Sequence, residues 1–289
     1  MTTNRPTMRV LETLVVTAVV TAVATVVVTV ATALHLAPTA SAQWLAHPTP
    51  GTPRLPDGRP SLMSPTPRAA DGRPDLSGVW EVTPDTVMPT DGRIRSKFIY
   101  NIAAARPGGA PFQPWARAVW DARQKTLGVG APTERCLPHG IPDAMLTATL
   151  PFKIVQHPGL TIVLFEEFNN WRQVFTDGRA LPTDPQPAWL GYSVGRWDAE
   201  TFVIETAGFN DKSWLDAGGT PHSDALRTVE RLRRIDFGHM EIEFRFDDPK
   251  TFTEPWSATV PFHLLPDTDL LEHHCDNEKW VEKLDRARR

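Results

Sequence analysis

The stretch that decides the fold is MEIEFRFDDPKTFTEPWSATVPFHL, Met240 to Leu264. In its first half an apolar residue occupies every second position from Met240 to Phe246, and the period of two returns from Trp256 to Leu264. Successive side chains of a β-strand point to opposite faces. Each half therefore predicts a strand with one buried and one wet face, which is typical of antiparallel sheets.

Short runs of the same kind continue upstream, separated by turn residues such as Pro158 with Gly159 and Asn169 with Asn170. This spacing predicts hairpins, and we expect about nine or ten strands in all. The clearest upstream runs are Leu76–Val82, Lys153–His157, Leu160–Phe168, Trp171–Thr176, Tyr192–Trp197 and Thr201–Thr206.

Helical signals are few. Pro114 begins one helix that ends before Gly128, and Asp276 would cap a short final helix. The predicted apolar stripe of the first helix consists of Trp115, Ala118, Val119 and Ala122. Strands and helices do not alternate, so the sequence predicts a mainly β fold: an antiparallel β-barrel or strongly curved sheet with one or two peripheral helices. Closure of the sheet removes exposed strand edges.

Residues 1–42 have the features of an export signal. Arg5 and Arg9 precede the uncharged apolar run Leu14–Leu34, and the small residues Ala40–Ala42 suit a signal peptidase. The run is also close to the length that spans a bilayer, so a retained anchor stays open as an alternative. Both alternatives place the rest of the chain in the periplasm or outside the cell. Only the retained anchor would give the protein a membrane partner.

Residues 43–73 are predicted to form a proline-rich linker, because seven prolines between Pro48 and Pro67 favour a stiff, extended chain. Residues 74–289 are predicted to form a single β-barrel-like domain. The spacing of Asp-Gly-Arg is irregular, which indicates a reused turn and not a structural repeat. This tripeptide begins at Asp57, Asp71, Asp91 and Asp177.

The net charge of −4 argues against a nucleic-acid partner, which requires a clustered basic surface. One dense basic run, Arg231 with Arg233 and Arg234, lies between Glu230 and Asp236, and we interpret it as a solvated strand face. The sequence has no dinucleotide fingerprint, no phosphate-binding loop and no histidine and cysteine spacing typical of a metal site. We therefore expect neither a cofactor nor a metal.

The two cysteines of the chain are Cys136 and Cys275. In an oxidising compartment, two isolated cysteines far apart in sequence are predicted to form a disulfide. Closing a loop of about 139 residues stabilises a fold by up to roughly 5 kcal/mol, because it removes conformational entropy from the unfolded chain.

Several motifs carry a resemblance to known proteins. Gly78 and Trp80 of GVW resemble the G-x-W opening of lipocalin-type, or calycin-like, barrels. From about Asp75 to Glu278, a longer set of motifs resembles a family of exported bacterial proteins. This set is PDLSGVW, CLPHGIP, FTDGR, GYSVGRW, TAGFND, PHSDALR, ERLRR and DDPKTFTEPW, in that order. The second resemblance implies export and a β-rich domain, and it implies no activity.

The densest polar motif, PHSDALRTVERLRR, contains the candidate catalytic residues. His222 is the candidate general base, with Asp224 or Glu230 assisting it. The structural alternative is a capped turn in which Glu230 pairs with an arginine of a neighbouring strand. GYSVG also reads as G-x-S-x-G, but its Ser193 lies within a predicted strand, whereas the hydrolase motif requires a helix to follow the serine.

The ten tryptophans indicate that a curved sheet either fills its own interior or encloses an apolar pocket. Glu166 and Glu167 would point to opposite faces of an extended strand, so one of them would face inward. We predict a site for a small apolar or aromatic molecule. Its candidate residues are Glu166, Arg172, Arg179, Tyr192, Arg196 and Trp197.

Three functional hypotheses follow. The protein is a small-molecule-binding barrel, or a cofactor-free hydrolase, lyase or isomerase based on His222, or a scaffold that acts through its outer face. The scaffold hypothesis predicts a fully packed barrel interior.

Overall fold

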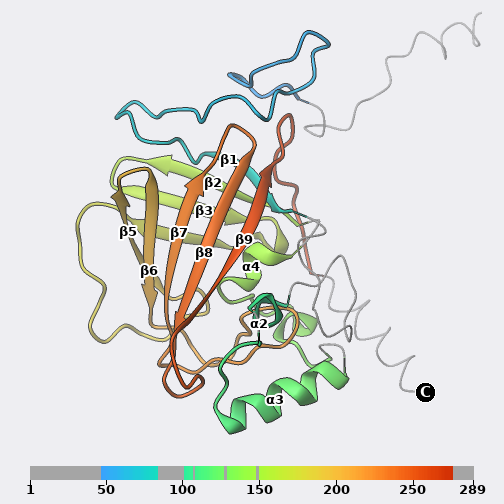
Figure 1. The fold of residues 1–289 in the computed structure, drawn as a ribbon, viewed down its shortest axis with the longest axis vertical. Helices are drawn as coiled ribbons and strands as arrows, with labels where there is room; N and C mark the ends of the chain where they lie inside the picture. The colour runs from blue at the N-terminus through green and yellow to red at the C-terminus, as the bar shows by residue number, and fades with distance from the viewer. Residues whose placement is uncertain (1–46, 84–100, 107, 127–128, 148–149, 276–289) are drawn as a thin grey trace, which may run out of the picture. The chain divides into compact units, whose positions relative to one another are not determined.

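The computed structural model describes residues 47–83, 101–106, 108–126, 129–147 and 150–275. Within them, nine strands form one closed barrel in which each strand pairs with the next and β9 pairs with β1 (Figure 1). The predicted barrel is confirmed. Its strands are β1 Gly78–Val82, β2 Phe152–His157, β3 Leu160–Phe165, β4 Trp171–Phe175, β5 Tyr192–Asp198, β6 Thr201–Ala207, β7 Arg227–Arg234, β8 His239–Asp247 and β9 Trp256–Leu264. The predicted export segment and the helix expected after Asp276 lie outside the described residues.

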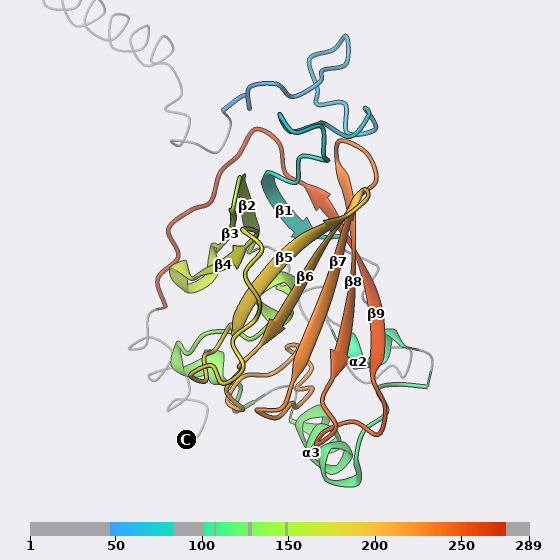
Figure 2. The same cartoon turned by 90° about the vertical axis from the view of Figure 1, so that its left-hand side faces the viewer.

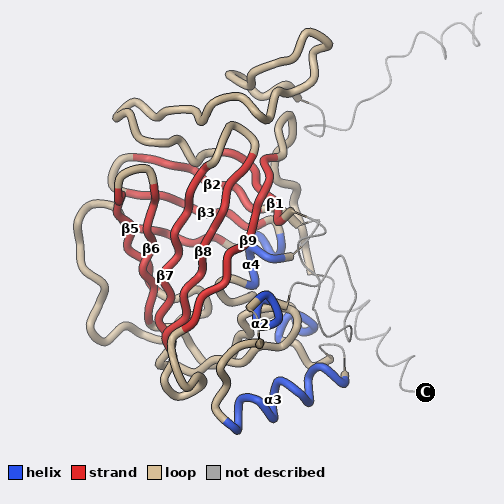
Figure 3. Tube along the Cα trace, viewed as in Figure 1, coloured by secondary structure: helices blue, strands red, loops and turns tan. Residues whose placement is uncertain are grey.

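One seam of the barrel departs from antiparallel pairing. β4 and β5 run parallel and share two register pairs, Val174 with Ser193 and Phe175 with Val194. A parallel pair needs a long connection that returns to the starting end of the sheet. Residues 176–191 supply this connection as a loop without a strand, and its prolines cannot donate to a sheet ladder (Figure 3).

Apolar rings fill the barrel interior. Gly195 on β5 lets the sheet approach them closely, because a Cβ there would lie 2.6 Å from the ring of Phe202 and 2.9 Å from Val174. Trp197 packs on the same ring, with the centroids 5.1 Å apart. The largest fully buried rings are Trp80, Phe152, Phe202, Phe209, Phe244, Phe246, Phe252 and Phe262. Most of them lie at the inward positions that the period of two predicts.

Four polar side chains, one from each of β4 to β7, are buried together inside the barrel, and we call them the interior quartet. Arg172 donates to both carboxylate oxygens of Glu230, at 2.6 and 3.0 Å. It also donates to Ser193 Oγ at 2.8 Å and to Thr206 Oγ1 at 2.5 Å. A buried charge is costly unless it is paired and hydrogen-bonded. The interior quartet meets this requirement and crosses the parallel seam.

Residues 47–77, which precede β1, cover one end of the barrel (Figures 1 and 2). This segment differs from the extended linker that its prolines predict, because P-R-x-x-D-G-R-P occurs twice, at 53–60 and 67–74, and folds the same way each time. The amide of Leu55 donates to the carbonyl of Arg59 at 2.8 Å, and that of Ala69 to the carbonyl of Arg73 at 2.9 Å. In each copy the aspartate accepts from the amide two residues later. These two Asp-Gly-Arg sequences therefore form a structural repeat, contrary to our expectation.

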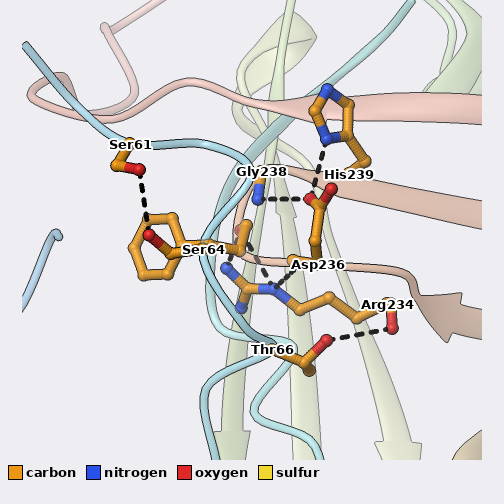
Figure 4. Close-up of polar contacts among 8 residues, drawn as sticks. Ser61, Ser64, Thr66, Arg234, Asp236, Gly238 and His239 are labelled. Carbon is orange, nitrogen blue, oxygen red and sulfur yellow. Dashed lines mark hydrogen bonds and ion pairs between the residues drawn. The ribbon is translucent and has the colours of Figure 1, made fainter. Parts of the chain in front are cut away.

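Arg234, at the end of β7, anchors this segment (Figure 4). Its guanidinium donates to the carbonyl oxygens of Asp75, at 2.5 Å, and Phe237, and its centre lies 4.9 Å from the ring centre of Trp80. The interpretation of the basic run as a solvated face is thus wrong for Arg234. Glu230, Leu232 and Arg234 are all buried, because alternate residues of a strand share one face.

Helices α2 Ile102–Ala105 and α3 Pro114–Lys125 lie toward the opposite end of the barrel, and α4 Asp143–Leu146 is close to β1 (Figure 1). The predicted helix at Pro114 is confirmed, but its buried face consists of Ala116, Trp120 and Gln124. The predicted stripe is wrong because Trp115 turns outward, where its indole donates to the carbonyl of Lys250 at 2.8 Å.

After β9, residues 265–275 run back along the outside of β2 to β4 (Figure 2), and we call them the C-terminal strap. Lys153 of β2 pairs with Asp269 of the strap at 2.8 Å. The strap ends at the Cys136–Cys275 disulfide, so the predicted disulfide is confirmed. Such a bond indicates an oxidising compartment.

Removing one partner of the interior quartet should be costly. We expect Arg172→Met to lower the free energy of unfolding by about 3–5 kcal/mol, because Glu230 would remain buried without its partner. The double variant Arg172→Met/Glu230→Leu should recover a large part of that loss. Urea denaturation would measure both. Arg196→Met, which removes an exposed ion pair with Glu205, is the control and should cost less than about 1 kcal/mol. Equal losses for Arg172→Met and Arg196→Met would contradict this role.

Loss of the disulfide should destabilise the barrel. We expect the double variant Cys136→Ser/Cys275→Ser to lose about 2–4 kcal/mol of unfolding free energy, because the unfolded chain gains the entropy of an open loop. A reducing agent should cause the same loss in the wild type and none in the double variant. Urea curves with and without the reductant distinguish the two outcomes.

Candidate functional site

The segment CLPHGIPDAM places a histidine between two carboxylates. His139 Nδ1 lies 2.5 Å from Oδ2 of Asp143, which begins α4. Nε2 lies 2.7 Å from Oε2 of Glu167. We call His139, Asp143 and Glu167 the His139 cluster.

A turn after β3 brings Glu167 to this cluster. The strand ends at Phe165 instead of continuing to Phe168 as predicted, and η2, Glu167–Asn169, follows with Phe168 at a φ of 60°. The Phe168 ring stacks on His139, with the centroids 5.6 Å apart. The expectation that one of two extended glutamates faces inward is therefore wrong. Glu166 instead accepts a hydrogen bond from the amide of Leu271 in the C-terminal strap at 2.8 Å.

Burial and charge act on His139 in opposite directions. Burial is the largest single influence and favours the neutral ring, but Asp143 and Glu167 together outweigh it and raise the pKa of His139 to about 10. The imidazole is therefore protonated at neutral pH. Its single positive charge faces two carboxyl groups.

The His139 cluster keeps hydrogen-bonding capacity that the described part of the chain does not use. Asp143 Oδ1, Glu167 Oε2 and His139 Nε2 are buried without a hydrogen-bond partner there. The short contact between the last two atoms is an ion pair that lacks the alignment of a hydrogen bond. Most buried polar atoms in proteins are hydrogen-bonded. His139 Nε2 and Glu167 Oε2 are paired with each other, so Asp143 Oδ1 is the atom of the cluster whose acceptor capacity the described residues leave unused.

A crevice adjoins the His139 cluster. The space between its walls does not admit even a water-sized molecule. The crevice is lined by His139, Ala144, Phe165, Glu167, Asn170 and Leu190. Phe165 also packs near Phe152 in the core, with the ring centroids 6.4 Å apart. One wall of the crevice is thus continuous with the aromatic core of the barrel.

The loop between β6 and β7 packs against the same segment at Gly140. A Cβ on Gly140 would lie 2.3 Å from Ser213 Oγ and 3.0 Å from the carbonyl oxygen of Trp214, so glycine is required here. Within this loop, Asp216 accepts hydrogen bonds from the amides of Ile102, at 2.6 Å, and Thr220, at 2.9 Å. Burial raises the pKa of Asp216 to about 6 in spite of these bonds.

His222, the predicted general base, lies in this loop and contacts Ser213. Its Nε2 is 2.8 Å from Ser213 Oγ, and its Nδ1 is 3.0 Å from the carbonyl oxygen of Ser223. Because a carbonyl oxygen only accepts, Nδ1 bears the proton and Nε2 accepts from the hydroxyl. Burial lowers the pKa of His222. The ring is therefore neutral at neutral pH.

The other two predicted catalytic residues lie elsewhere. Asp224 is exposed and pairs with Lys250 at 2.6 Å, and this hydrogen bond lowers the pKa of its carboxyl. Glu230 is inside the barrel and pairs with Arg172. The structure therefore does not bring His222, Asp224 and Glu230 together. Each has a different partner.

The predicted ligand-binding residues are also dispersed. Arg172 belongs to the interior quartet, Trp197 is half-buried against the core, and Tyr192 is exposed. Arg196 pairs with Glu205 on the outer surface, and Arg179 pairs with Asp177 while covering the ring of Phe175. Of these five side chains, only Arg172 has its charged group inside the barrel.

The residues of the His139 cluster and Ser213 were not among the sequence candidates. A histidine four residues before an aspartate in CLPHGIPDAM was an available signal. Glu167 could not be added to it, because its position depends on a turn that the strand pattern hides. Ser213 could not be paired with His222 without knowing how the long loop folds.

Comparisons with known proteins leave the site to be interpreted from its own geometry. No protein-family model, no curated protein and no solved structure matches this chain. In the described ranges, no group of three or more His, Cys, Asp or Glu side chains is arranged to hold a metal ion. None of the helices described there is long and apolar enough to cross a membrane.

The raised pKa of His139 predicts a pH dependence of stability. The charged ring stabilises the fold fully below the unfolded pKa of about 6.5, and this contribution declines as the pH rises toward about 10. We expect the unfolding free energy of the wild type to fall between pH 7 and 9.5 more steeply than that of His139→Gln, by up to about 1.4 kcal/mol per pH unit. Urea denaturation at several pH values measures the two slopes. Parallel pH profiles would rule out a charged His139.

Proposed function

We propose that this β-barrel protein is exported and binds a small organic cation with an apolar body at the crevice beside His139, whose walls separate to admit it. The observation that carries the proposal is the buried charge of the His139 cluster, in which Asp143 Oδ1 has no hydrogen bond, next to the apolar side chains of Phe165 and Leu190. Few polar groups within an apolar recess are typical of small-molecule sites.

The charge of the His139 cluster selects the ligand class. One imidazolium faces the carboxyl groups of Asp143 and Glu167, so an ionised pair leaves one negative charge unbalanced. An ammonium group would balance that charge and donate to the carboxylate of Glu167, which lines the crevice. An aromatic or alkyl body would lie against Phe165. The sequence predicts an apolar or aromatic ligand, and the charge of the His139 cluster narrows this class to molecules that also carry a cationic group.

The barrel interior is a poorer site for such a ligand. Its rings are fully buried, and the interior quartet satisfies its own charges. A ligand there would have to displace core side chains. A packed interior is also what the scaffold hypothesis predicts, but the buried charges of His139 and Glu167 beside the crevice favour binding.

Export is supported by the disulfide and by the N-terminal sequence. The Cys136–Cys275 bond suits an oxidising compartment. The basic and apolar residues before Ala42 suit a secretion signal. The resemblance to exported bacterial proteins agrees with this placement.

The proposal predicts that amines stabilise the protein and that neutral analogues do not. We expect benzylamine and hexylamine to raise the melting temperature in a concentration-dependent way, whereas benzyl alcohol and 1-hexanol should not. A ligand that binds only the folded state stabilises it by about 2.7 kcal/mol at 100 times its Kd. Differential scanning fluorimetry of the disulfide-bonded protein measures these shifts.

A matched pair of variants tests the location. Glu167→Gln should weaken amine binding at least tenfold, because it removes a carboxylate of the crevice and keeps its shape. Glu205→Gln removes an exposed carboxylate on the barrel wall and should leave binding unchanged. Equal responses to amines and alcohols, or equal effects of the two variants, would overturn the proposal.

A further inference from the structure

The loop between β6 and β7 holds a serine and a histidine in a directed contact. His222 Nδ1 donates to the carbonyl oxygen of Ser223, which leaves the lone pair of Nε2 for Ser213 Oγ at 2.8 Å. The hydroxyl therefore donates to the ring. A hydroxyl that donates to a neutral imidazole, with the ring oriented by a third group, is the arrangement of an activated nucleophile.

A buried carboxylate supports the orienting group. Asp248, in the turn after β8, accepts from the amide and from the hydroxyl of Ser223, both at 2.7 Å. It fixes the residue whose carbonyl holds His222. The chain of contacts runs from Asp248 through Ser223 and His222 to Ser213, and Phe209 packs edge-on against the imidazole.

We infer that Ser213 is the nucleophile and His222 the general base of an acyl-transfer site that hydrolyses small carboxylic esters. The sequence candidate Asp224 has no part in it, and Asp248 is a positioning residue. Burial, which lowers the pKa of His222, keeps its base form available at neutral pH. This inference is independent of the ligand proposed for the His139 crevice.

The reaction balances without a cofactor. Ser213 Oγ forms a bond to the ester carbonyl carbon while its proton passes to His222 Nε2 and the π electron pair moves to the carbonyl oxygen. When this intermediate collapses, the ester C–O bond breaks and the leaving alkoxide takes the proton from Nε2. Water, activated by the same nitrogen, then releases the acid and restores the serine.

Access to Ser213 depends on the segment that carries Gly140. Ser213 is 3% exposed, and the backbone of Gly140 lies directly against its hydroxyl. A substrate must therefore separate Gly140 from Ser213. His139, the neighbouring residue, is held by the His139 cluster and borders the crevice, so the separation would extend that crevice toward the serine.

A serine-directed reagent tests this inference without knowledge of the substrate. We expect diisopropyl fluorophosphate to add one group to the folded, disulfide-bonded wild-type protein, and peptide mass spectrometry should locate it on Ser213. Ser213→Ala should abolish the adduct, and His222→Gln should slow its formation at least 100-fold. 4-Nitrophenyl acetate should release about one equivalent of nitrophenolate in a burst.

Controls separate this site from other serines and from general effects of substitution. Ser257→Ala, on β9, and Glu205→Gln, on β6, should both keep the labelling rate within twofold of the wild type. Circular dichroism establishes that each variant is folded. The absence of an adduct on Ser213 of the folded wild type after overnight incubation overturns the inference. Labelling of His222→Gln at the wild-type rate overturns it as well.

Discussion

The barrel depends on one buried ion pair. Arg172 and Glu230 lie on β4 and β7, and the two strands between them contribute Ser193 and Thr206 to the same network. This network spans the parallel seam, which has only two register pairs. Breaking the seam would separate Arg172 from its partners and leave a charge unsatisfied in an apolar interior, at a cost of several kcal/mol. The quartet therefore makes closure of the barrel selective for this one register.

The two buried histidines, His139 and His222, lie at one end of the barrel, outside its packed interior. At the other end, Arg234 donates to the carbonyl of Asp75 and covers Trp80. The contacts at that end stabilise the fold. The long connections before β2 and before β7, together with the turn after β8, meet at the end toward which α2 and α3 lie. They bring together His139, His222 and Asp248, whose loops are far apart in sequence. The disulfide fastens the C-terminal strap to the same region.

The barrel could be predicted from the sequence because alternation is a local property of each strand. The same alternation, applied strictly, also places Glu230 and Arg234 on the inward face of β7 with Leu232. We expected a solvated face because charged residues are mostly exposed, and only the partners Arg172 and Trp80 reverse that expectation. The site was less accessible to prediction. His222 was a sequence candidate for a general base with Asp224 or Glu230, but its contact with Ser213 is fixed by loop packing that no local pattern encodes.

The two histidines of this end are held in opposite states by their neighbours. His139 lies between two carboxyl groups, which stabilise the imidazolium in spite of burial. His222 contacts a hydroxyl and a carbonyl oxygen, neither of which is charged. Burial therefore lowers the pKa of its ring. Environments that separate the pKa values of two titratable groups allow one to hold a charge while the other accepts a proton. Their loops touch at Gly140, where a Cβ would collide with Ser213, so one glycine lets a charged and a neutral histidine share one end of the barrel.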